Sequence, residues 1–384
     1  MNKKIKLAVI VEATVGGIRK HIHDLLINLD NSKFEIALIY SKLRADRTFE
    51  SDLHEFNQKE INLIELDMTR NINPVADLKS LIKLIKILKD ISPDIIHLHA
   101  AKAGTLGRIA AKVLRINNIV YTPHGGSFHK FNERLGFVYK FVEKLLAFSS
   151  VHFIAVSNHA KLQYKKLLNI PDDKNHLIYN GILLKTPEAI NIFEMKKKYQ
   201  CEENDLIVLI PAVFYEAKGH LQLLDAAKDL IKKINPKIKI LLAGDGHLRK
   251  KIESKILELE LENQIILLGF VNEMHPLFSI SDVVLLPSQN EVFGYVLLEA
   301  MLYSKPIFAT NVDAIPELVK DRINGELFER DRLIDIFERL NYFADDKNKL
   351  EEMGNAGFKN LKEQFSLDLM VNKTEELYLK IISN

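Results

Sequence analysis

What this sequence lacks excludes disulfide bonds and membrane-spanning segments. The chain has 384 residues and a single cysteine, Cys201, so no disulfide can form within it, which is typical of a reducing compartment. No apolar run approaches the roughly 18–20 residues that span a bilayer. The start, "MNKKIKLAVIVE", joins positive charge to a short apolar run, but no small-residue cleavage site follows, so it predicts a first strand and not a signal peptide. We therefore expect a cytoplasmic protein.

The chain also has little net charge, only +2, but that charge is unevenly distributed. Residues 1–180 contain 27 Lys+Arg against 18 Asp+Glu, a balance of +9, and residues 181–384 contain 26 against 33, a balance of −7. A basic first half indicates that it faces an anionic partner, although a lysine-rich solvated surface is an equally good reading. The basic residues are not interleaved with a recognised nucleic-acid-binding module, so we expect no nucleic-acid partner.

Length and periodicity predict two α/β domains. A chain of 384 residues exceeds one ordinary core and suits two domains of about 150–200 residues. Apolar strands alternate with helical patterns in the first half ("IKLAVIVE", "FEIALIYS", "DIIHLHA", "NIVYTPHG", "VHFIAVS"), and the pattern restarts in the second ("LIVLIPAVF", "IKILLAGDG", "IILLGFV", "DVVLLPS", "PIFATNV"). Continuous apolar strands of this kind form parallel sheets buried on both faces, so each half is expected to be doubly wound. We place the boundary near Asn180–Gly181.

Two glutamates stand eight residues apart in "NEVFGYVLLEAM", residues 290–301. The preceding "DVVLLPS" predicts a strand and the following "YVLLEAMLYS" a helix, so Glu291 lies in the loop and Glu299 about two turns into the helix. Free amides at the helix start, from Phe293 to Val296, form an anion site together with the helix dipole. A phosphate beside sugar hydroxyls fits this pattern. The plain structural alternative is a helix-start acid and a solvated helix acid.

Three further turns place glycine or lysine directly after a strand, where backbone amides or a cation can meet a phosphate: Gly16-Gly17, Lys218-Gly219 and Gly244-Asp245. As a dinucleotide fingerprint the last is poor, because Arg249 occupies the third glycine position and no acidic strand end follows about 20 residues on. Hydride transfer is therefore not expected.

Histidines end two of the expected strands. His124 in "YTPHGG" should point toward a ligand, or else be satisfied by neighbouring backbone. His97 and His99 are two apart and share one strand face, so a metal pair is conceivable. Because no third ligand is evident from the sequence, we expect these histidines to line a cleft and expect no metal site.

The chain resembles, nearly end to end, the retaining glycosyltransferases of family 4, which have the GT-B fold and use nucleotide-diphosphate sugars. The resemblance rests on Gly16-Gly17, "KAGTLGRIAAK", "YTPHG", "NGI", "KGH", "GDG", "LGFV", "PELV…NGELF" and above all on the E-x7-E motif from Glu291 to Glu299. The segment "HAAKAGTLGRIAAKVLRINNIVYTPHGGSFH" resembles the branch that builds bacterial surface polysaccharides.

The resemblance implies an architecture and a reaction. Residues 1–180 and 181–362 would be Rossmann-like domains facing each other across a cleft, and residues 363–384 a helix packing back on the first. The donor would be a UDP-linked nucleotide sugar carrying a hexose or N-acetylhexosamine, and the acceptor would be a glycan, lipid-linked in this branch. No cofactor beyond the nucleotide sugar would be needed.

The resemblance also implies a role for each site residue. Glu291 would accept hydrogen bonds from sugar hydroxyls, Glu299 would bind the ribose, and Lys218 would neutralise the leaving phosphate. His124 would lie near the donor sugar. The other donor-binding residues would meet the diphosphate or the base, and they are Gly16, Gly17, Gly244, Asp245, Gly269, Phe270, Val271, Phe293, Gly294, Tyr295 and Val296.

Retention of anomeric configuration also follows from the resemblance, through same-face substitution in which a diphosphate oxygen helps to deprotonate the acceptor. No Asp-x-Asp occurs in the chain, so we expect a metal-independent enzyme in which Lys218 and helix amides stabilise the departing diphosphate. Two positions depart from the family pattern: Ala212-Val213 replaces Gly-Arg, and Asp313-Ala314 replaces Gly-Gly. The bases that could replace the missing arginine are Arg19, Lys20 and Arg249.

Two segments of the basic half are typical of membrane-surface helices. Residues 77–89 have one apolar face (Leu78, Leu81, Ile82, Ile85, Leu88) and one lysine face (Lys79, Lys83, Lys86, Lys89). Residues 128–148 mix aromatic side chains (Phe128, Phe131, Phe137, Tyr139, Phe141, Phe148) with basic ones (Lys130, Arg134, Lys140, Lys144). We expect weak, salt-sensitive contact with anionic lipid of the inner membrane face; burial of the aromatic side chains in a core is the alternative.

Two other functions stay open at this point. A nucleotide-sugar 2-epimerase shares the two-domain architecture and cleaves the same bond, although no matching proton-abstraction motif is evident. A degenerate protein that binds sugar nucleotides without turnover is the other, because the family's arginine is missing.

Overall fold

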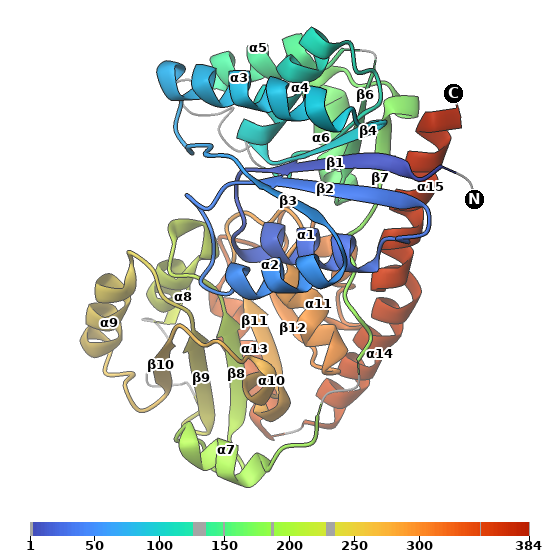
Figure 1. Cartoon of the computed structure of the whole chain (residues 1–384). Coiled ribbons are helices and arrows are strands. Elements are labelled where there is room, and N and C mark those ends of the chain that lie inside the picture. The colour runs from blue at the N-terminus through green and yellow to red at the C-terminus, as the bar shows by residue number, and fades with distance from the viewer. Residues whose placement is uncertain are drawn as a thin grey trace. The chain divides into compact units, whose positions relative to one another are not determined.

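The computed structural model describes residues 3–125, 136–148, 150–185, 188–227, 235–345 and 347–383 (Figure 1). The chain divides into two compact units, Met1–Gly181 with Leu367–Asn384, and Ile182–Ser366. Helix α14 (Asn348–Gln364) continues through the expected boundary between residues 362 and 363. The return to the first unit therefore comes at Leu367, a few residues later than expected.

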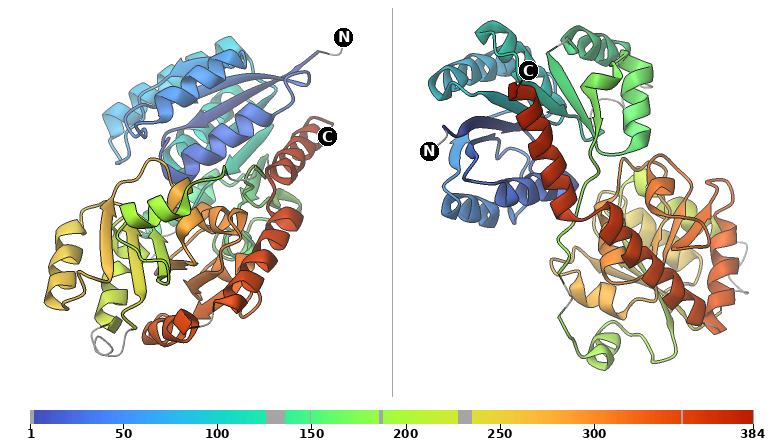
Figure 2. Two further views of the ribbon diagram at one scale, coloured as in Figure 1. Left: turned by 90° about the horizontal axis from the view of Figure 1, so that it is seen from below. Right: turned by 90° about the vertical axis from the view of Figure 1, so that its right-hand side faces the viewer.

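The first unit contains a seven-stranded parallel sheet with the strand order β3-β2-β1-β4-β5-β6-β7 (Figures 1 and 2). Its strands are β1 (Ile5–Val11), β2 (Phe34–Tyr40), β3 (Asn62–Glu65), β4 (Ile95–His99), β5 (Ile119–Thr122), β6 (Val151–Ala155) and β7 (Asn175–Leu177). Its helices are α1 (Gly16–Asn28), α2 (Phe49–Gln58), α3 (Pro74–Ile91), α4 (Ala101–Leu114), α5 (Gly136–Leu146), α6 (Asn158–Leu168) and α15 (Leu367–Ser383).

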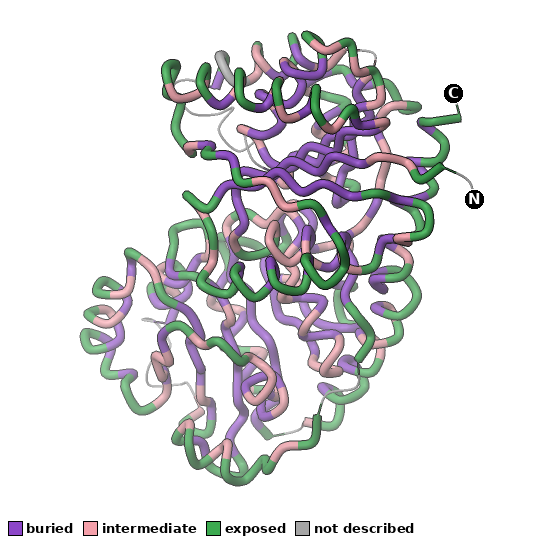
Figure 3. Tube along the Cα trace, viewed as in Figure 1, coloured by how far each residue is buried: buried purple, intermediate pink, exposed green. Residues whose placement is uncertain are grey.

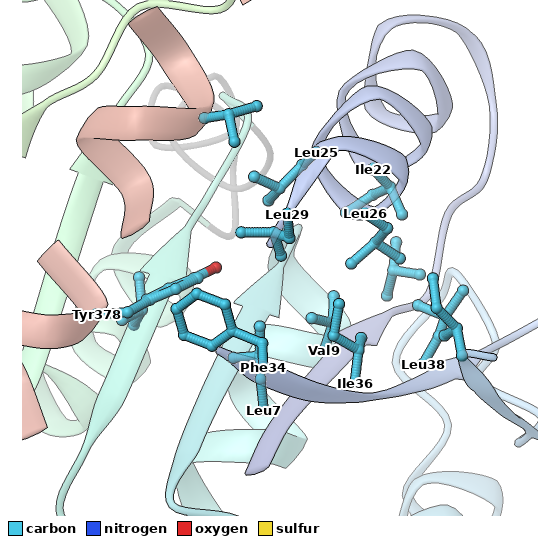
Figure 4. Packing of buried hydrophobic residues seen from close by; sticks show 14 of the residues in the cluster. Leu7, Val9, Ile22, Leu25, Leu26, Leu29, Phe34, Ile36, Leu38 and Tyr378 are labelled. Carbon is cyan, nitrogen blue, oxygen red and sulfur yellow. The ribbon is translucent and has the colours of Figure 1, made fainter. Parts of the chain in front are cut away.

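The C-terminal helix α15 is part of the core of the first unit. Tyr378 is fully buried, and its ring meets the Phe34 ring edge-on at 5.7 Å between centroids (Figure 4). Its hydroxyl lies 2.6 Å from Nδ1 of His97 on β4. Leu25 and Leu29 of α1 belong to the same apolar cluster. A segment far away in the sequence therefore completes one face of the sheet.

The second unit contains a six-stranded parallel sheet with the order β10-β9-β8-β11-β12-β13. Its strands are β8 (Leu206–Pro211), β9 (Ile238–Ala243), β10 (Ile265–Gly269), β11 (Val283–Leu286), β12 (Ile307–Thr310) and β13 (Gly325–Phe328). Its helices are α7 (Ile192–Lys198), α8 (His220–Ala227), α9 (Arg249–Glu258), α10 (His275–Ile280), α11 (Tyr295–Leu302), α12 (Ile315–Leu318), α13 (Ile334–Asp345) and α14. The two doubly wound parallel sheets predicted from the apolar strands are confirmed.

The central strands are buried over most of their length, as Figure 3 shows for both units, and β4, β5, β11 and β12 are buried throughout. The apolar face predicted for α3 is correct in part. Leu88 is buried and Leu81 and Ile85 pack against the core, but Leu78 and Ile82 are exposed. Among the described residues, no helix is both long enough and apolar enough to cross a bilayer.

Candidate active site

The strand order of the second sheet reverses between β8 and β11. The loops that leave these two neighbouring strands carry two predicted site residues, Lys218 and Glu291. In open parallel sheets, the crevice for a ligand lies at the carboxyl ends of the strands where the order reverses. Strand β8 leads to the short 3₁₀ turn Glu216–Lys218, and β11 leads to the loop that contains Glu291. Both side chains therefore lie where this fold binds its ligands.

Lys218 and Glu291 form an ion pair although 73 residues separate them in the chain. The Lys218 ammonium lies 2.5 Å from Oε2 of Glu291, and the side chains are 25% and 11% exposed. The backbone N–H of Glu291 donates to Oδ2 of Asp313 at 2.9 Å. Glu291 is thus fixed both at its backbone, by Asp313, and at its carboxylate, by Lys218.

The two loops are packed too closely for any side chain at Gly219. A Cβ on this residue would lie 1.8 Å from the carbonyl oxygen of Pro287, and its φ of +74° favours glycine. The backbone N–H of Gln289 donates to the carbonyl of Ala217 at 2.8 Å. This contact explains why glycine follows Lys218 and fixes the lysine against the acid loop.

Helix α11 begins directly after the acid loop, with Gly294 at its N-cap in a left-handed conformation, φ +85°. Glu299 is half-buried in the helix, as predicted, and Tyr295 and Val296 are half-buried in its first turn. Phe293 is buried, and its ring packs against Phe365, so only its backbone is available to a ligand.

The Gly-Asp-Gly turn after β9 lies against the loop after β8. A Cβ on Gly244 would lie 2.0 Å from the carbonyl oxygen of Ala212, and the carbonyl of Asp245 accepts the backbone N–H of Phe214 at 3.0 Å. Gly244 is therefore required by the packing of two loops.

Arg249 links this turn to the end of β10. One of its guanidinium nitrogens, Nη1, lies 3.4 Å from Asp245 and 3.2 Å from where a Cβ of Gly269 would be. Phe270, which directly follows Gly269, is exposed, and Val271 is half-buried.

Two buried polar atoms near the ion pair have no hydrogen-bond partner among the described residues, Oγ of Ser288 and Nε2 of Gln289. Buried polar groups are nearly always hydrogen-bonded, and each one left unsatisfied costs about 1–3 kcal/mol. Both residues belong to the loop between β11 and Glu291, so a hydroxyl-rich ligand there would satisfy them.

In the first unit the glycine loop after β1 is tied to the segment before α2. Gly16 has a φ of +52°, and its N–H donates to Oδ2 of Asp46 at 2.7 Å; Gly17 is exposed. Arg19 donates to both carboxylate oxygens of Asp52, at 2.5 and 2.6 Å. The guanidinium of Arg19 is thus committed to an internal partner.

Three histidines gather at the carboxyl ends of the central strands of this unit. Nδ1 of His99, at the end of β4, lies 3.0 Å from Nε2 of His124, which follows β5. His21, in α1, faces both, with its ring centroid 5.5 Å from that of His99 and 4.8 Å from that of His124. His97 instead bonds Tyr378 and Thr122. Burial lowers the pKa of all four rings, that of His21 to about 4, so the neutral imidazole is the form present near pH 7.

Sequence reasoning missed three residues of these sites: His21, Asn180 and Asp313. For His21 a signal existed, because it stands four residues after Gly17 and so one helical turn along the buried face of α1. The contact of Asp313 with Glu291 and the contact of Asn180 with His21 depend on loop geometry that spacing does not encode.

Comparison with known proteins matches each unit to a glycosyltransferase family model. Residues 15–185 match the family model "Glycosyltransferase Family 4", and residues 191–360 match "Glycosyl transferases group 1". An Escherichia coli UDP-Gal:alpha-D-GlcNAc-diphosphoundecaprenol alpha-1,3-galactosyltransferase is 30% identical over 322 residues, covering 83% of each chain. The capsular polysaccharide biosynthesis glycosyltransferase CapM of Staphylococcus aureus is 26% identical over 82% of this chain and 83% of its own.

Solved structures show the same fold. HepE of Anabaena in complex with UDP and glucose superposes with a TM-score of 0.83 at 20% identity, over 98% of this chain and all of that one. The GT-B fold and the transferase class expected from the sequence are confirmed. The chain belongs to the GT-B glycosyltransferases of the family 4 kind.

Proposed function

We propose that this enzyme is a retaining transferase that moves a hexosyl or N-acetylhexosaminyl group from a UDP-sugar to a glycan acceptor carried on a lipid diphosphate. The Escherichia coli relative, whose name gives UDP-Gal as donor and a diphosphoundecaprenol-linked GlcNAc as acceptor, supports this substrate class. The capsular relative supports a place in surface-polysaccharide synthesis.

The observation that carries the proposal is the Lys218–Glu291 pair at the point where the second sheet reverses its order. The carboxylate of Glu291, whose backbone is fixed by Asp313, can accept hydrogen bonds from two sugar hydroxyls. The Lys218 ammonium beside it can contact the departing diphosphate oxygen. Glu299 would bind the ribose hydroxyls, and the amides at Gly294 and Tyr295 would meet the diphosphate.

A donor screen tests the substrate class. The purified enzyme is incubated with UDP-glucose, UDP-galactose and their N-acetylhexosamine counterparts, each with and without a GlcNAc-diphospho-lipid. We expect UDP release from one donor, dependent on the acceptor. An altered sugar on intact UDP would instead establish an epimerase, and donor binding without turnover would establish a binding protein.

The stereochemistry has its own measurement. Same-face substitution through an oxocarbenium-like state keeps the anomeric configuration, so a UDP-α-hexose should give an α-linked product. The one-bond carbon–proton coupling at the anomeric centre distinguishes the two configurations by NMR. A β-linked product would refute the retaining mechanism and leave the donor specificity untouched.

We also propose that the first unit attaches to anionic lipid on the inner face of the cell membrane. Helix α5 exposes Phe137, Phe141 and Leu145 at four-residue spacing, so these side chains share one helix face, with Lys140 and Lys144 on the same helix. Helix α3 exposes a second apolar group, Leu78 and Ile82, among the lysines named above. Phe128, Lys130, Phe131, Arg134 and the side chain of Tyr139 lie outside the described residues.

Vesicle co-sedimentation tests this attachment. Phe137→Ser should reduce binding to vesicles containing phosphatidylglycerol by severalfold, because it removes an aromatic side chain that is 72% exposed. Phe193→Ser in the second unit is the matched control, since Phe193 is also 72% exposed and lies on α7. Binding should weaken as salt is raised. Binding that ignores salt, or equal losses in both variants, would contradict the proposal.

A further inference from the structure

We propose that His21, His99 and His124 form a binding site for a first-row divalent metal ion of the zinc class. One ligand nitrogen from each ring lies within 4.8 Å of the other two, and this is the group of metal-ligating side chains that the described part of the chain brings together. The expectation of no metal site rested on the lack of a third ligand near His97 and His99. The fold brings two further ligands, His21 and His124, to His99. His97 is instead hydrogen-bonded to Tyr378 and Thr122.

Three different elements deliver the rings to one point. His99 is the last residue of β4, His124 follows the neighbouring strand β5, and His21 comes from the helix that follows β1. The order of the first sheet reverses between β1 and β4, so this point is where the fold places ligands. His124 holds a left-handed backbone, φ +52°, which is unusual for a residue other than glycine and is typical of functional sites.

The hydrogen bonds leave ligand atoms available. Nδ1 of His21 lies 2.9 Å from Oδ1 of Asn180, an acceptor, so Nδ1 carries the proton and Nε2 carries a lone pair. That Nε2 is buried without a hydrogen-bond partner among the described residues. A histidine whose far nitrogen is fixed by an amide or carbonyl oxygen is the usual arrangement in metal sites, because it sets the tautomer and the ring orientation.

The distances fit a tetrahedral ion after small adjustments. Two nitrogens bound at about 2.0–2.1 Å to a tetrahedral zinc ion lie about 3.3 Å apart. Nδ1 of His99 and Nε2 of His124 are already 3.0 Å apart, and the widest separation in the group requires a side-chain shift of about 1.5 Å. Imidazole ligands select zinc, copper or nickel over magnesium and calcium, and three protein ligands leave one position for water or a hydroxyl group.

Metal binding by tag-free protein tests the proposal. The protein is stripped with a chelator, and Zn²⁺ is then titrated in competition with a chromogenic chelator. We expect one tight equivalent, which His99→Ala and His124→Ala should abolish. Asn180→Ala should weaken zinc binding by about 10–100-fold, and Asn180→Asp, which keeps an acceptor for Nδ1 of His21, should restore most of it. Co²⁺ in place of Zn²⁺ should give the visible absorption of a tetrahedral site.

A second histidine pair in the same unit is the matched control. Nδ1 of His152 lies 3.0 Å from Nε2 of His176, the same separation as in the His99–His124 contact, but a lysine, Lys174, occupies the other side at 2.8 Å from His152. The double variant His152→Gln/His176→Gln should therefore keep its zinc. The proposal would be overturned if the parent bound less than a tenth of an equivalent of Zn²⁺ at excess zinc. It would also be overturned if His99→Ala or Asn180→Ala bound Zn²⁺ with the same affinity as the parent. Thermal melting identifies variants that do not fold. If the histidine variants are unfolded, the comparison of Asn180→Ala with Asn180→Asp decides the outcome.

Discussion

Replacing Lys218 with alanine should separate its proposed role in the reaction from its role in stability. The Lys218–Glu291 pair is partly exposed, with the lysine side chain 25% and the glutamate side chain 11% accessible. Partly exposed ion pairs contribute about 1 kcal/mol or less to stability, which corresponds to a melting shift of about 2–4 °C for a unit of this size. Removing one preorganised hydrogen-bond donor that faces developing charge costs about 2.7–4 kcal/mol of transition-state stabilisation. The catalytic effect is the larger of the two.

We therefore expect kcat for acceptor-dependent UDP release to fall about 10²–10³-fold in Lys218→Ala while the melting temperature falls by less than about 4 °C. Lys255→Ala is the control, because Lys255 is 20% exposed in the same unit and pairs with Asp225 at 3.0 Å. It should melt similarly and keep its kcat. A kcat within threefold of the parent in Lys218→Ala would refute the reasoning, as would an equal loss in Lys255→Ala.

Three more outcomes follow from individual contacts. Asp313→Ala removes the acceptor for the backbone N–H of Glu291, so kcat should fall about tenfold, whereas Asp313→Asn keeps an acceptor and should lose less than threefold, both measured by UDP release. Glu143→Leu strands the Arg108 guanidinium, which is fully buried and 2.8 Å from that carboxylate, and should cost about 3–5 kcal/mol in urea unfolding; a loss below 1 kcal/mol would contradict this. Burial lowers the pKa of His220 to about 4 from 6.5, so the unfolded chain binds more protons between these values and stability falls as the pH falls from 6.5 to 4. His220→Leu should remove up to about 3 kcal/mol of that loss, read from unfolding free energies at pH 7 and pH 4.

Strand prediction succeeded for every central strand and for one edge strand, β10, and it missed the other three edge strands. The ten apolar runs named from the sequence all correspond to strands, and nine of these are central parallel strands, which have no solvent face and so no polar alternation. The strands that the sequence did not reveal are β3, β7 and β13, which are short and lie at sheet edges. Edge strands bury less, and "NLIE" and "NHL" carry polar residues for that reason.

The candidate site was predicted residue by residue but not as a set of contacts. Spacing shows that Glu291 follows a strand and that Lys218 follows another, since both stand directly after apolar runs. It does not show that β8 and β11 are neighbours, because strand order in a doubly wound sheet is a property of the topology. The ion pair depends on that order, and so does the meeting of His99 with His124 across β4 and β5.

Asp313, which stands where the family pattern has glycine, keeps a left-handed backbone conformation and adds a hydrogen bond. Its φ is +46°, in the left-handed region that glycine adopts freely and that aspartate and asparagine tolerate better than other residues. The family's Gly-Gly at this position thus meets the same backbone need, and the aspartate additionally accepts the N–H of Glu291. The substitution is therefore compatible with a working acid loop.

Because the arginine of the family pattern is absent, another residue would have to supply its positive charge to the diphosphate. Because Lys218 is already neutralised by Glu291, the pair brings no net positive charge to a diphosphate, and α11 supplies only the partial charges of its amides. Of the bases that could replace the arginine, Arg19 has both oxygens of Asp52 as partners and Lys20 is paired with Asp24 at 3.2 Å. Arg249 is also paired, but it is more exposed and lies between the Gly-Asp-Gly turn and Gly269, in the same unit as the lysine. Its carboxylate partners are exposed and can release it at little cost, so of the three bases we propose Arg249 as the one that meets the leaving group.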